Sequence, residues 1–375
     1  MKKKLLFGIT SLTLGGAERV LVDLANALCN KYDITVFTIY SKGELEKQLA
    51  GEVKLKSLCN NSYAELSKIQ KKLMSAKVLL LRNKIYKKNI KEDFDIEIAF
   101  LEGPITRLFS VKNKKARKIA WIHNDITKVF GRGLKSTLKK KVDKKMYSKY
   151  NTLVFVSKDN LKKFNEEYKD IRNKYLEPIK KEVIYNYIDK ENIIKKAEEK
   201  MDVELNKDIL NFITVARLVE QKGIDRLIEV HNKLIKDGLN HVFYIIGDGP
   251  EKERLQELIK KYKIENTFKL LGKKENPYPY IKNADYFCLL SRFEGYGMVL
   301  EEAKILDKPI IITDTAAREA VEKYDNATIL DNTEDGIYIG LKNTIINYKN
   351  RLKSKNKFEY DNKNVIEKIE KLLEG

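Results

Sequence analysis

The sequence has few cysteines and no long apolar run. Cys29, Cys59 and Cys288 lack the spacing of a zinc or redox motif and lie in apolar surroundings, which favours places in the core. The longest apolar stretches, such as the one at 77–81, are far shorter than the roughly 20 residues that cross a bilayer. The lysines at 2–4 lead into a short strand and not into the hydrophobic segment of a signal peptide. We therefore expect a cytoplasmic chain with reduced cysteines.

Acidic side chains are scarce in the first half of the chain. Residues 1–200 carry 45 Lys and Arg against 24 Asp and Glu, giving +21, whereas residues 201–375 carry 29 against 30. The surplus is concentrated in 68–91 and 112–149. Such a surface typically binds nucleic acid or an anionic membrane, and a lysine-rich background with solvated helix faces is the alternative. Because no recognition-helix, zinc or aromatic RNA-binding signature is present, we favour the membrane.

Apolar runs alternate with amphipathic stretches throughout the 375 residues, which are enough for two domains with full cores. The runs are nearly continuous, as expected when both faces of a parallel sheet are covered. The strands predicted in the first half are 3–10, 34–39, 53–58, 95–101, 118–123, 152–157 and 182–185. Those predicted in the second half are 209–215, 242–246, 267–271, 285–290, 309–313 and 327–330. The fold class is therefore α/β, with two doubly wound domains.

The most informative segment, 291–303, places two carboxylates eight residues apart around a glycine-rich turn. A buried strand precedes the turn and a helix follows it, so Glu294 is expected at the carboxyl edge of the sheet, where ligands of open α/β sheets bind. Glycines let the backbone approach a ligand, and free N–H groups at the start of the helix suit an anion. Glu302, one turn into the helix, would face hydroxyl groups. The ligand-contacting residues predicted in the turn are Gly295, Tyr296, Gly297, Met298 and Val299.

Glu294, the Gly-Tyr-Gly turn and Glu302 together resemble the E-x7-E motif of retaining family-4 glycosyltransferases of the GT-B fold. Neighbouring Glu301 is an alternative for the second carboxylate, but the spacing favours Glu302. Three further segments resemble motifs of this family in the same order, namely 14–19, 215–223 and 245–250. The resemblance covers nearly the whole chain. It implies two Rossmann-like domains that face each other across a cleft.

The resemblance also implies how the chain is divided. Residues 1–188 would form an acceptor-binding domain, and 189–208 would be a hinge region. Residues 209–357 would form the nucleotide-sugar-binding domain. The amphipathic pattern in 358–375 would be a final helix that returns to the first domain.

By resemblance, Arg217 and Lys222 neutralise the leaving nucleoside diphosphate, which removes the need for a metal ion. Glu302 would hydrogen-bond the ribose of the nucleotide, and Glu294 would approach the transferred sugar. His123, at the end of a strand of the first domain, would lie by the sugar and the acceptor. The alternative for Arg217, Lys222, Glu294 and Glu302 is that they are solvated surface side chains. The alternative for His123 is a structural role.

Further ligand contacts are implied by the matching loops, although Ala216 stands where the family has glycine. These contacts are Gly15, Gly16, Gly247, Gly272 and Lys273. The last two belong to a loop that resembles the one recognising the nucleobase, for which uracil is the first choice and guanine or adenine stay open. Asp93 and Asp95 match a metal-binding D-x-D motif but precede a strand, on the wrong edge for a ligand. His231 and His241 are expected to be structural.

We therefore expect a retaining glycosyltransferase that moves a sugar from a nucleotide-sugar donor, UDP-hexose or UDP-N-acetylhexosamine, to a glycan acceptor. No cofactor or metal is expected. The expected partners are a nucleotide sugar, a lipid-linked glycan and an anionic membrane surface, which would place the chain at the inner face of the cell membrane in cell-surface polysaccharide or glycoconjugate synthesis. Two alternatives stay open. A nucleotide-sugar epimerase on the same fold would release an altered free nucleotide sugar, and a nucleic-acid-binding protein would also explain the basic charge.

Overall fold

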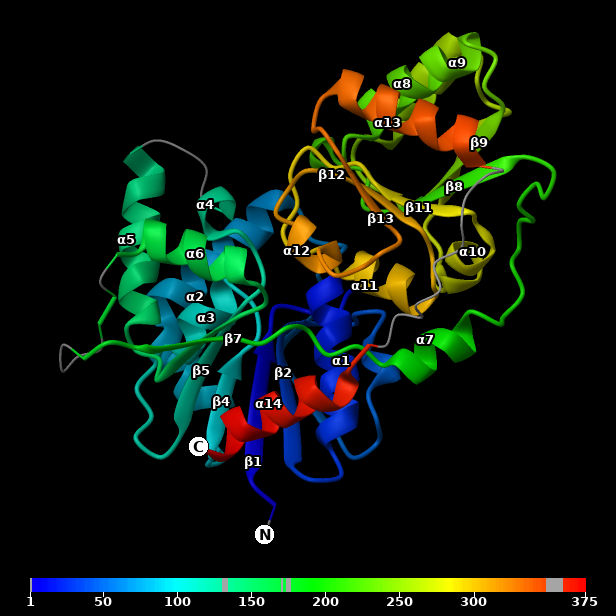
Figure 1. The fold of residues 1–375 in the computed structure, drawn as a ribbon. Helices are drawn as coiled ribbons and strands as arrows, with labels where there is room; N and C mark the ends of the chain where they lie inside the picture. The colour runs from blue at the N-terminus through cyan, green and yellow to red at the C-terminus, as the bar shows by residue number, and fades with distance from the viewer. Residues whose placement is uncertain (1, 130–133, 170, 173–176, 349–359) are drawn as a thin grey trace. The chain divides into compact units, whose positions relative to one another are not determined.

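The chain forms two compact units, one of residues Met1–Ile188 with Asn362–Gly375 and one of residues Asp189–Asp361. Each unit holds one parallel β-sheet covered by helices (Figure 1). This computed structural model describes residues 2–129, 134–169, 171–172, 177–348 and 360–375. The α/β class predicted from the apolar runs is confirmed in both units.

The first unit is built on a parallel sheet in the order β3-β2-β1-β4-β5-β6-β7. Its strands are β1 (Lys4–Ile9), β2 (Asp33–Ser41), β3 (Lys54–Ser62), β4 (Ile96–Ala99), β5 (Arg117–Ile122), β6 (Thr152–Phe155) and β7 (Lys180–Val183). Its helices are α1 (Gly16–Leu28), η1 (Glu46–Gln48), α2 (Lys68–Asn89), α3 (Pro104–Phe109), α4 (Ile126–Val129), α5 (Leu134–Tyr147), α6 (Lys158–Glu167) and α14 (Asn362–Glu374). The strand order reverses between β1 and β4, so the loops after these strands flank a switch point.

Helix α14 packs on the first unit, although it lies at the far end of the sequence. Its apolar side chains Ile369, Leu372 and Leu373 are buried. Lys31, after α1, pairs with Glu370 and with Glu374 at 3.0 Å each. The last helix therefore contributes both apolar burial and ion pairs to the first unit.

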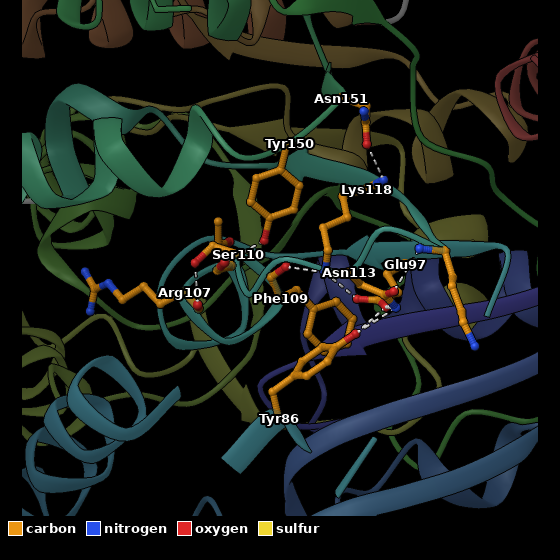
Figure 2. Close-up of polar contacts among 11 residues, drawn as sticks. Tyr86, Glu97, Arg107, Phe109, Ser110, Asn113, Lys118, Tyr150 and Asn151 are labelled. Carbon is orange, nitrogen blue, oxygen red and sulfur yellow. Dashed lines mark hydrogen bonds and ion pairs between the residues drawn. The ribbon is translucent and has the colours of Figure 1, made fainter. Parts of the chain in front are cut away.

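A buried polar cluster joins α2 to the sheet of the first unit (Figure 2). Glu97 on β4 accepts hydrogen bonds from the Tyr86 hydroxyl, from Asn113 Nδ2 at 2.7 Å and from Lys118 Nζ at 2.6 Å. Lys118 Nζ also donates to the Phe109 carbonyl at 2.7 Å. Burial lowers the pKa of Lys118, and the Glu97 carboxylate opposes this effect. Because its charges are paired and hydrogen-bonded, the cluster can occupy the core of the unit.

The second unit has a parallel sheet in the order β10-β9-β8-β11-β12-β13. Its strands are β8 (Leu210–Val215), β9 (His241–Ile246), β10 (Phe268–Gly272), β11 (Tyr286–Leu289), β12 (Ile310–Thr313) and β13 (Ala327–Leu330). Its helices are α7 (Lys190–Lys196), η2 (Glu220–Lys222), α8 (Ile224–Lys236), α9 (Lys252–Tyr262), α10 (Tyr278–Asn283), α11 (Met298–Ile305), α12 (Arg318–Val321) and α13 (Glu334–Asn347). Here the order reverses between β8 and β11.

The predicted hinge region, 189–208, contains α7, which contacts α10 and α11 of the second unit. Asn276 Nδ2 donates to the Lys196 carbonyl at 2.8 Å, and the Asp202 backbone N–H donates to the Tyr280 hydroxyl at 3.2 Å. The segment therefore packs as part of the second unit, and its hinge role stays a prediction. The predicted boundary at 357–358 lies outside the described residues.

Candidate functional site

The candidate site of the second unit lies where its strand order reverses. Strand β8 pairs in parallel with β9 on one side and with β11 on the other. The loops after β8 and β11, residues 216–223 and 290–297, therefore leave the same edge of the sheet on either side of the switch point. Both loops carry residues that the sequence predicted for ligand binding.

Lys222 and Glu294, predicted from separate motifs, form an ion pair between these two loops. Their side chains are 17% and 11% exposed, so the pair is largely removed from solvent. Ser291 Oγ donates to the same carboxylate oxygen, Glu294 Oε2, at 3.2 Å. Gly223, which follows Lys222, is the N-cap of α8. Its φ of 65° lies in the left-handed region, which favours glycine. A cation and a carboxylate are thus held together at the carboxyl edge of the sheet.

Additional contacts fix the two loops to each other, and they involve residues that sequence reasoning did not single out. The Arg292 guanidinium donates two hydrogen bonds to the Asp225 carboxylate, at 2.6 and 3.1 Å. Gln221 Nε2 donates to the Phe293 carbonyl at 3.1 Å, and the Gln221 carbonyl accepts from the Arg292 N–H at 2.8 Å. Burial alone would raise the pKa of Asp225, but Arg292 outweighs it and holds that pKa below its usual value. These bonds place Glu294 opposite Lys222.

Helix α11 begins directly after the glycine-rich turn. Gly297, its N-cap, has φ 75°, and a Cβ atom there would lie 3.1 Å from the Leu300 side chain and 3.3 Å from that of Leu289. Glycine is therefore favoured at this position. The positive end of the helix dipole therefore lies at this turn. That Met298 and Val299 contact an anion stays a prediction.

The two adjacent glutamates of α11 have different surroundings. Glu301 is buried and pairs with Lys304, whose Nζ lies 2.8 Å from Glu301 Oε1. Glu302 is partly exposed, and its Oε1 accepts from the Tyr278 hydroxyl at 3.3 Å. Of the two side chains, that of Glu302 is therefore the more exposed, and its contact with a ligand stays a prediction.

Glycines bring the loops after β8, β9 and β10 close together. A Cβ atom on Gly247, which has φ 150°, would lie 1.9 Å from the Ala216 carbonyl oxygen. The Gly247 N–H donates to the Gly272 carbonyl at 2.9 Å, and the Leu218 N–H donates to the Asp248 carbonyl at 3.0 Å. The close approach of these loops therefore requires glycine at 247, and the positive φ of 72° favours glycine at 272.

Two further predicted cations lie on these loops with exposed side chains. Arg217 follows β8 by two residues, and Lys273 follows β10 directly. Both leave the carboxyl edge of the sheet, on which the ion pair also lies. The structure thus brings Lys222 into contact with Glu294 and leaves Arg217 and Lys273 facing solvent.

In the first unit, His123 follows β5 and is fixed through its backbone. The His123 and Asn124 N–H groups donate to Glu102 Oε1 at 2.6 and 2.7 Å, and Asn124 Nδ2 donates to Glu102 Oε2 at 2.9 Å. The imidazole packs on the Phe100 ring, with centroids 4.8 Å apart. Burial lowers the pKa of His123 to about 3, so the ring is neutral at physiological pH.

Glu102, which sequence reasoning did not single out, fixes the backbone beside His123. It follows β4 at the switch point of the first sheet, and Gly103, with φ 96°, turns the chain into α3. Burial raises the pKa of Glu102, and the hydrogen bonds from residues 123 and 124 oppose that effect. The sequence signal that could have pointed to this residue is a carboxylate followed by Gly-Pro at the end of an apolar run.

Gly15 and Gly16 lie after β1, next to β4 in the sheet. Gly15 is the N-cap of α1 and Gly16 is its first residue. A Cβ atom on Gly15 would lie 2.2 Å from Glu18 Oε2, the end of a flexible side chain that can move away. That Gly15 and Gly16 contact a ligand stays a prediction.

The D-x-D match has no metal geometry. Asp93 pairs with Lys115 at 2.6 Å, and Asp95 Oδ2 accepts from the Lys4 N–H at 2.7 Å, on the amino side of β4. Within the described ranges, no group of three or more His, Cys, Asp or Glu side chains is arranged to hold a metal ion. In the same part of the chain, none of the helices combines the length and the apolar character needed to cross a bilayer.

Comparisons with known proteins agree with this architecture. Residues 195–365 match the sequence model of a family described as glycosyl transferases group 1. Over 374 residues the chain is 30% identical to N-acetylgalactosamine-N,N'-diacetylbacillosaminyl-diphospho-undecaprenol 4-alpha-N-acetylgalactosaminyltransferase of Campylobacter jejuni, covering 95% of this chain and 93% of the relative. The amylovoran biosynthesis glycosyltransferase AmsD of Erwinia amylovora is 31% identical over 134 residues, or 36% of this chain and 38% of the relative.

Solved structures extend the likeness to the fold of the whole chain. Anabaena HepE in complex with UDP and glucose matches with a TM-score of 0.74 at 17% sequence identity, covering 100% of both chains. The two parallel sheets, each with its switch point, correspond to the GT-B architecture. With a relative 30% identical along nearly its full length, the chain belongs to the group 1 glycosyltransferases of the GT-B fold.

Proposed function

We propose that the chain transfers a hexose or N-acetylhexosamine from a UDP-sugar to a hydroxyl group of a lipid-linked glycan, with retention of the anomeric configuration. The observation that carries this proposal is the Lys222–Glu294 pair at the sheet edge from which α11 begins. It offers a cation and a carboxylate beside the N-terminus of a helix, which are the partners that a diphosphate-linked sugar needs. The UDP bound by HepE and the lipid diphosphate in the name of the Campylobacter relative support these substrate classes.

The roles of the residues follow from their chemistry. Lys222 and exposed Arg217 bind the diphosphate, together with the N–H groups at the start of α11. Glu294 accepts from a hydroxyl group of the transferred sugar, and Glu302 accepts from the ribose. Gly272 and Lys273 lie by the nucleobase. Each charge-assisted hydrogen bond of this kind contributes about 1.5–3 kcal/mol.

The ion pair has to rearrange when the donor binds. Without a ligand, Lys222 neutralises Glu294, so neither charge is left unpaired in a site that is largely closed to water. A diphosphate competes for Lys222, and a sugar hydroxyl group takes its place beside the carboxylate. The site thus exchanges one set of charge-assisted bonds for another, which limits the cost of desolvating the donor.

Catalysis in this proposal rests on positioning and electrostatics. The cations and the helix N-terminus stabilise the negative charge that develops on the departing diphosphate. The acceptor hydroxyl group attacks from the face that the diphosphate leaves, and the diphosphate takes up its proton. His123, as a neutral ring, and the Gly15–Gly16 turn serve the sugar and acceptor side. We assign no side-chain nucleophile and no metal ion.

Donor screening tests this function directly. Purified protein is mixed with UDP-, GDP- and ADP-sugars and assayed for thermal stabilisation and for nucleotide release, with and without EDTA. We expect UDP-sugars to stabilise the protein and release to persist in EDTA. Loss of turnover in EDTA that manganese restores would contradict metal independence. Release of an altered free nucleotide sugar without an acceptor would favour the epimerase.

A matched pair of variants tests the ion pair. Lys222→Met should lower kcat/KM for the donor at least about tenfold, equal to about 1.4 kcal/mol of transition-state stabilisation. Lys236→Met, at the exposed far end of α8, removes the same charge away from the site and should leave the kinetics unchanged. Equal kinetics in the two variants would contradict the diphosphate site.

We also propose that α2 holds the first unit on an anionic membrane, next to its lipid-linked acceptor. Helix α2 carries eight basic and no acidic side chains. Ile69, Leu73 and Leu80 are 70%, 64% and 79% exposed, and their spacing puts them on one face of the helix. The opposite face buries Val78 and Ile85 in the core. An apolar stripe flanked by lysines is typical of helices that lie in a membrane interface.

Residues 135–149, part of the second basic stretch, add further lysines along α5, and we propose that they face the same membrane. The side chain of Lys135 lies outside the described residues. Lys139, Lys141 and Lys145 are exposed. Each cation near an anionic surface contributes about 1 kcal/mol, so a few of them are enough for reversible binding.

Vesicle co-sedimentation tests the membrane proposal. The protein should bind vesicles with phosphatidylglycerol at low salt, leave them at high salt and ignore neutral vesicles and duplex DNA. Lys84→Gln with Lys87→Gln should weaken binding about thirtyfold, the equivalent of two cations at about 1 kcal/mol each. Leu73→Ser with Leu80→Ser should weaken binding at every salt concentration, because it removes apolar contact.

The control for these variants is Lys260→Gln with Lys261→Gln, an equal loss of charge on exposed α9 of the second unit. Its binding should match that of the unaltered chain. Equal weakening in all charge variants would indicate a non-specific effect of net charge, and preference for DNA would reopen the nucleic-acid alternative.

A further inference from the structure

A second polar network joins the glycine-rich turn to the helix after it, and it includes Tyr296, which the sequence predicted as a ligand contact. The Tyr296 hydroxyl donates to Glu301 Oε1 at 2.8 Å. Lys304 Nζ donates to the same oxygen at 2.8 Å and to the Ala320 carbonyl, in α12, at 2.6 Å. Glu301 and Lys304 are buried, with side chains only 5% and 7% exposed. The network therefore links the turn, α11 and α12.

Stability alone does not explain such a pair. Burying two charges costs desolvation energy that their attraction only partly returns, and apolar residues of similar size are often as good or better. The pair does supply a fixed hydrogen-bond acceptor beneath the turn. Glu301 Oε1 is held in place by Lys304, which is itself held by the Ala320 carbonyl.

The two glycines of the turn supply no side chain that could pack and hold it. A Cβ atom on Gly295 would meet nothing within 4 Å, so packing does not restrict the chain there. Gly297 has φ 75° and is conformationally free for lack of a side chain. Tyr296 is the side chain between these two glycines, and its hydroxyl group is bonded to Glu301. A turn with two glycines loses much entropy on ordering, and this bond removes part of that cost before a ligand arrives.

We infer that Tyr296, Glu301 and Lys304 are positioning residues that hold the Gly295–Gly297 turn in its ligand-binding conformation. By holding the turn they aim the first N–H groups of α11 at the donor diphosphate, a role that rests on the proposed function. Glu301 thereby acts on the donor through Tyr296, whereas its neighbour Glu302 contacts the donor itself.

Tyr296→Phe tests the inference with the smallest change. The expected result is weaker UDP binding and a higher KM for the donor, each by about fivefold, the loss typical of one hydrogen bond. The change in kcat should be smaller, and the thermal midpoint should move little because the hydroxyl group lies at the edge of the core. Hydrogen–deuterium exchange of the 294–300 segment in the ligand-free protein should become faster.

The matched control is Tyr338→Phe. Tyr338 on α13 makes the same kind of contacts, a hydrogen bond to Asp237 and one from Lys342, but at the exposed end of α8. This variant should keep the exchange of 294–300, the UDP affinity and the KM of the unaltered chain.

Two double variants separate an effect on the position of the turn from an effect on the stability of the unit. Both remove the buried charges. Glu301→Gln with Lys304→Met keeps a hydrogen-bond acceptor for Tyr296. Glu301→Leu with Lys304→Met removes that acceptor. The first should stay within about threefold of the unaltered chain in KM. The second should reproduce the exchange and KM of Tyr296→Phe.

The inference is overturned if exchange of 294–300 is the same in Tyr296→Phe as in Tyr338→Phe, or if the two double variants behave alike. That readout needs no substrate. Failure of the unaltered chain to bind UDP or to release it from any donor would instead contradict the proposed function, so the two failures are distinguishable.

Discussion

Replacing Lys118 by methionine should destabilise the first unit strongly, because it leaves a buried carboxylate without its cation. The side chains of Lys118 and Glu97 are 4% and 0% exposed, and Nζ lies 2.6 Å from Oε2 (Figure 2). Removing one partner of a buried ion pair typically costs about 3–5 kcal/mol. Tyr86 and Asn113 still donate to Glu97, which places the expected loss at the lower end, about 3 kcal/mol. For a unit of this size that equals roughly 6–12 °C in thermal midpoint.

The loss of stability can be measured by the fluorescence of a tryptophan in the first unit. Trp121 is its only tryptophan and is buried on β5, the strand that also carries Lys118. Tryptophan fluorescence during urea denaturation therefore follows the first unit. Glu97→Gln with Lys118→Met should recover part of the loss, because a neutral amide can still bond to Tyr86 and Asn113.

Lys115→Met is the control, since it also removes one lysine of an ion pair from the same unit. Lys115 and Asp93 are 70% and 68% exposed, and exposed pairs contribute about 0–1 kcal/mol. If Lys118→Met and Lys115→Met have the same urea midpoint, the buried cluster does not support the fold as argued.

Arg217→Ala should lower kcat/KM for the donor by about tenfold with an unchanged thermal midpoint, because the side chain is exposed and acts on the diphosphate. Glu302→Gln should weaken binding of UDP itself, whereas Glu294→Gln should chiefly lower turnover. Titration of UDP against both decides this, and an equal loss of affinity would contradict their separate roles. Burial lowers the pKa of His231 to about 2 and that of His241 to about 4. Both imidazoles are neutral in the folded chain, whereas in the unfolded chain they take up a proton below about pH 6.5. As the pH falls from about 6.5 toward the lowered pKa values of the fold, the free energy of unfolding should therefore decrease. The decrease is up to about 1.4 kcal/mol per pH unit for each histidine. Urea denaturation followed by circular dichroism at pH 7 and pH 5 measures the slope, and a flat profile would contradict the burial.

Much of the fold could be predicted because strands covered on both faces read as apolar runs. Strand β13 has the predicted bounds, and the other predicted strands differ by a few residues at their ends. The pairing of Lys222 with Glu294 could not be predicted from local patterns. It depends on β11 lying beside β8, which are 70 residues apart in sequence and adjacent only in the sheet order.

Some helices could not be predicted from the sequence, for physical reasons. Helix α13 has two glycines, Gly336 and Gly340, and several β-branched residues, which weaken its helical pattern. A Cβ atom on Gly340 would lie 2.3 Å from the Leu330 side chain, so close packing on β13 requires that glycine. Helices α3 and α10 begin at or just after proline and are too short to show a period. In these cases tertiary packing outweighs local propensity.

The uneven charge of the chain belongs to its surface, even though several charged side chains are buried. Among the described residues of the first unit, the buried charged side chains are three acidic ones, Glu97, Glu102 and Asp143, and one basic one, Lys118. Glu97 pairs with Lys118, and Asp143 pairs with Arg107. Burial therefore removes more acidic than basic groups from this unit, and the described part of the basic surplus lies at the surface. That surplus is therefore available to an anionic partner, and its effect should weaken with salt as surface electrostatics do.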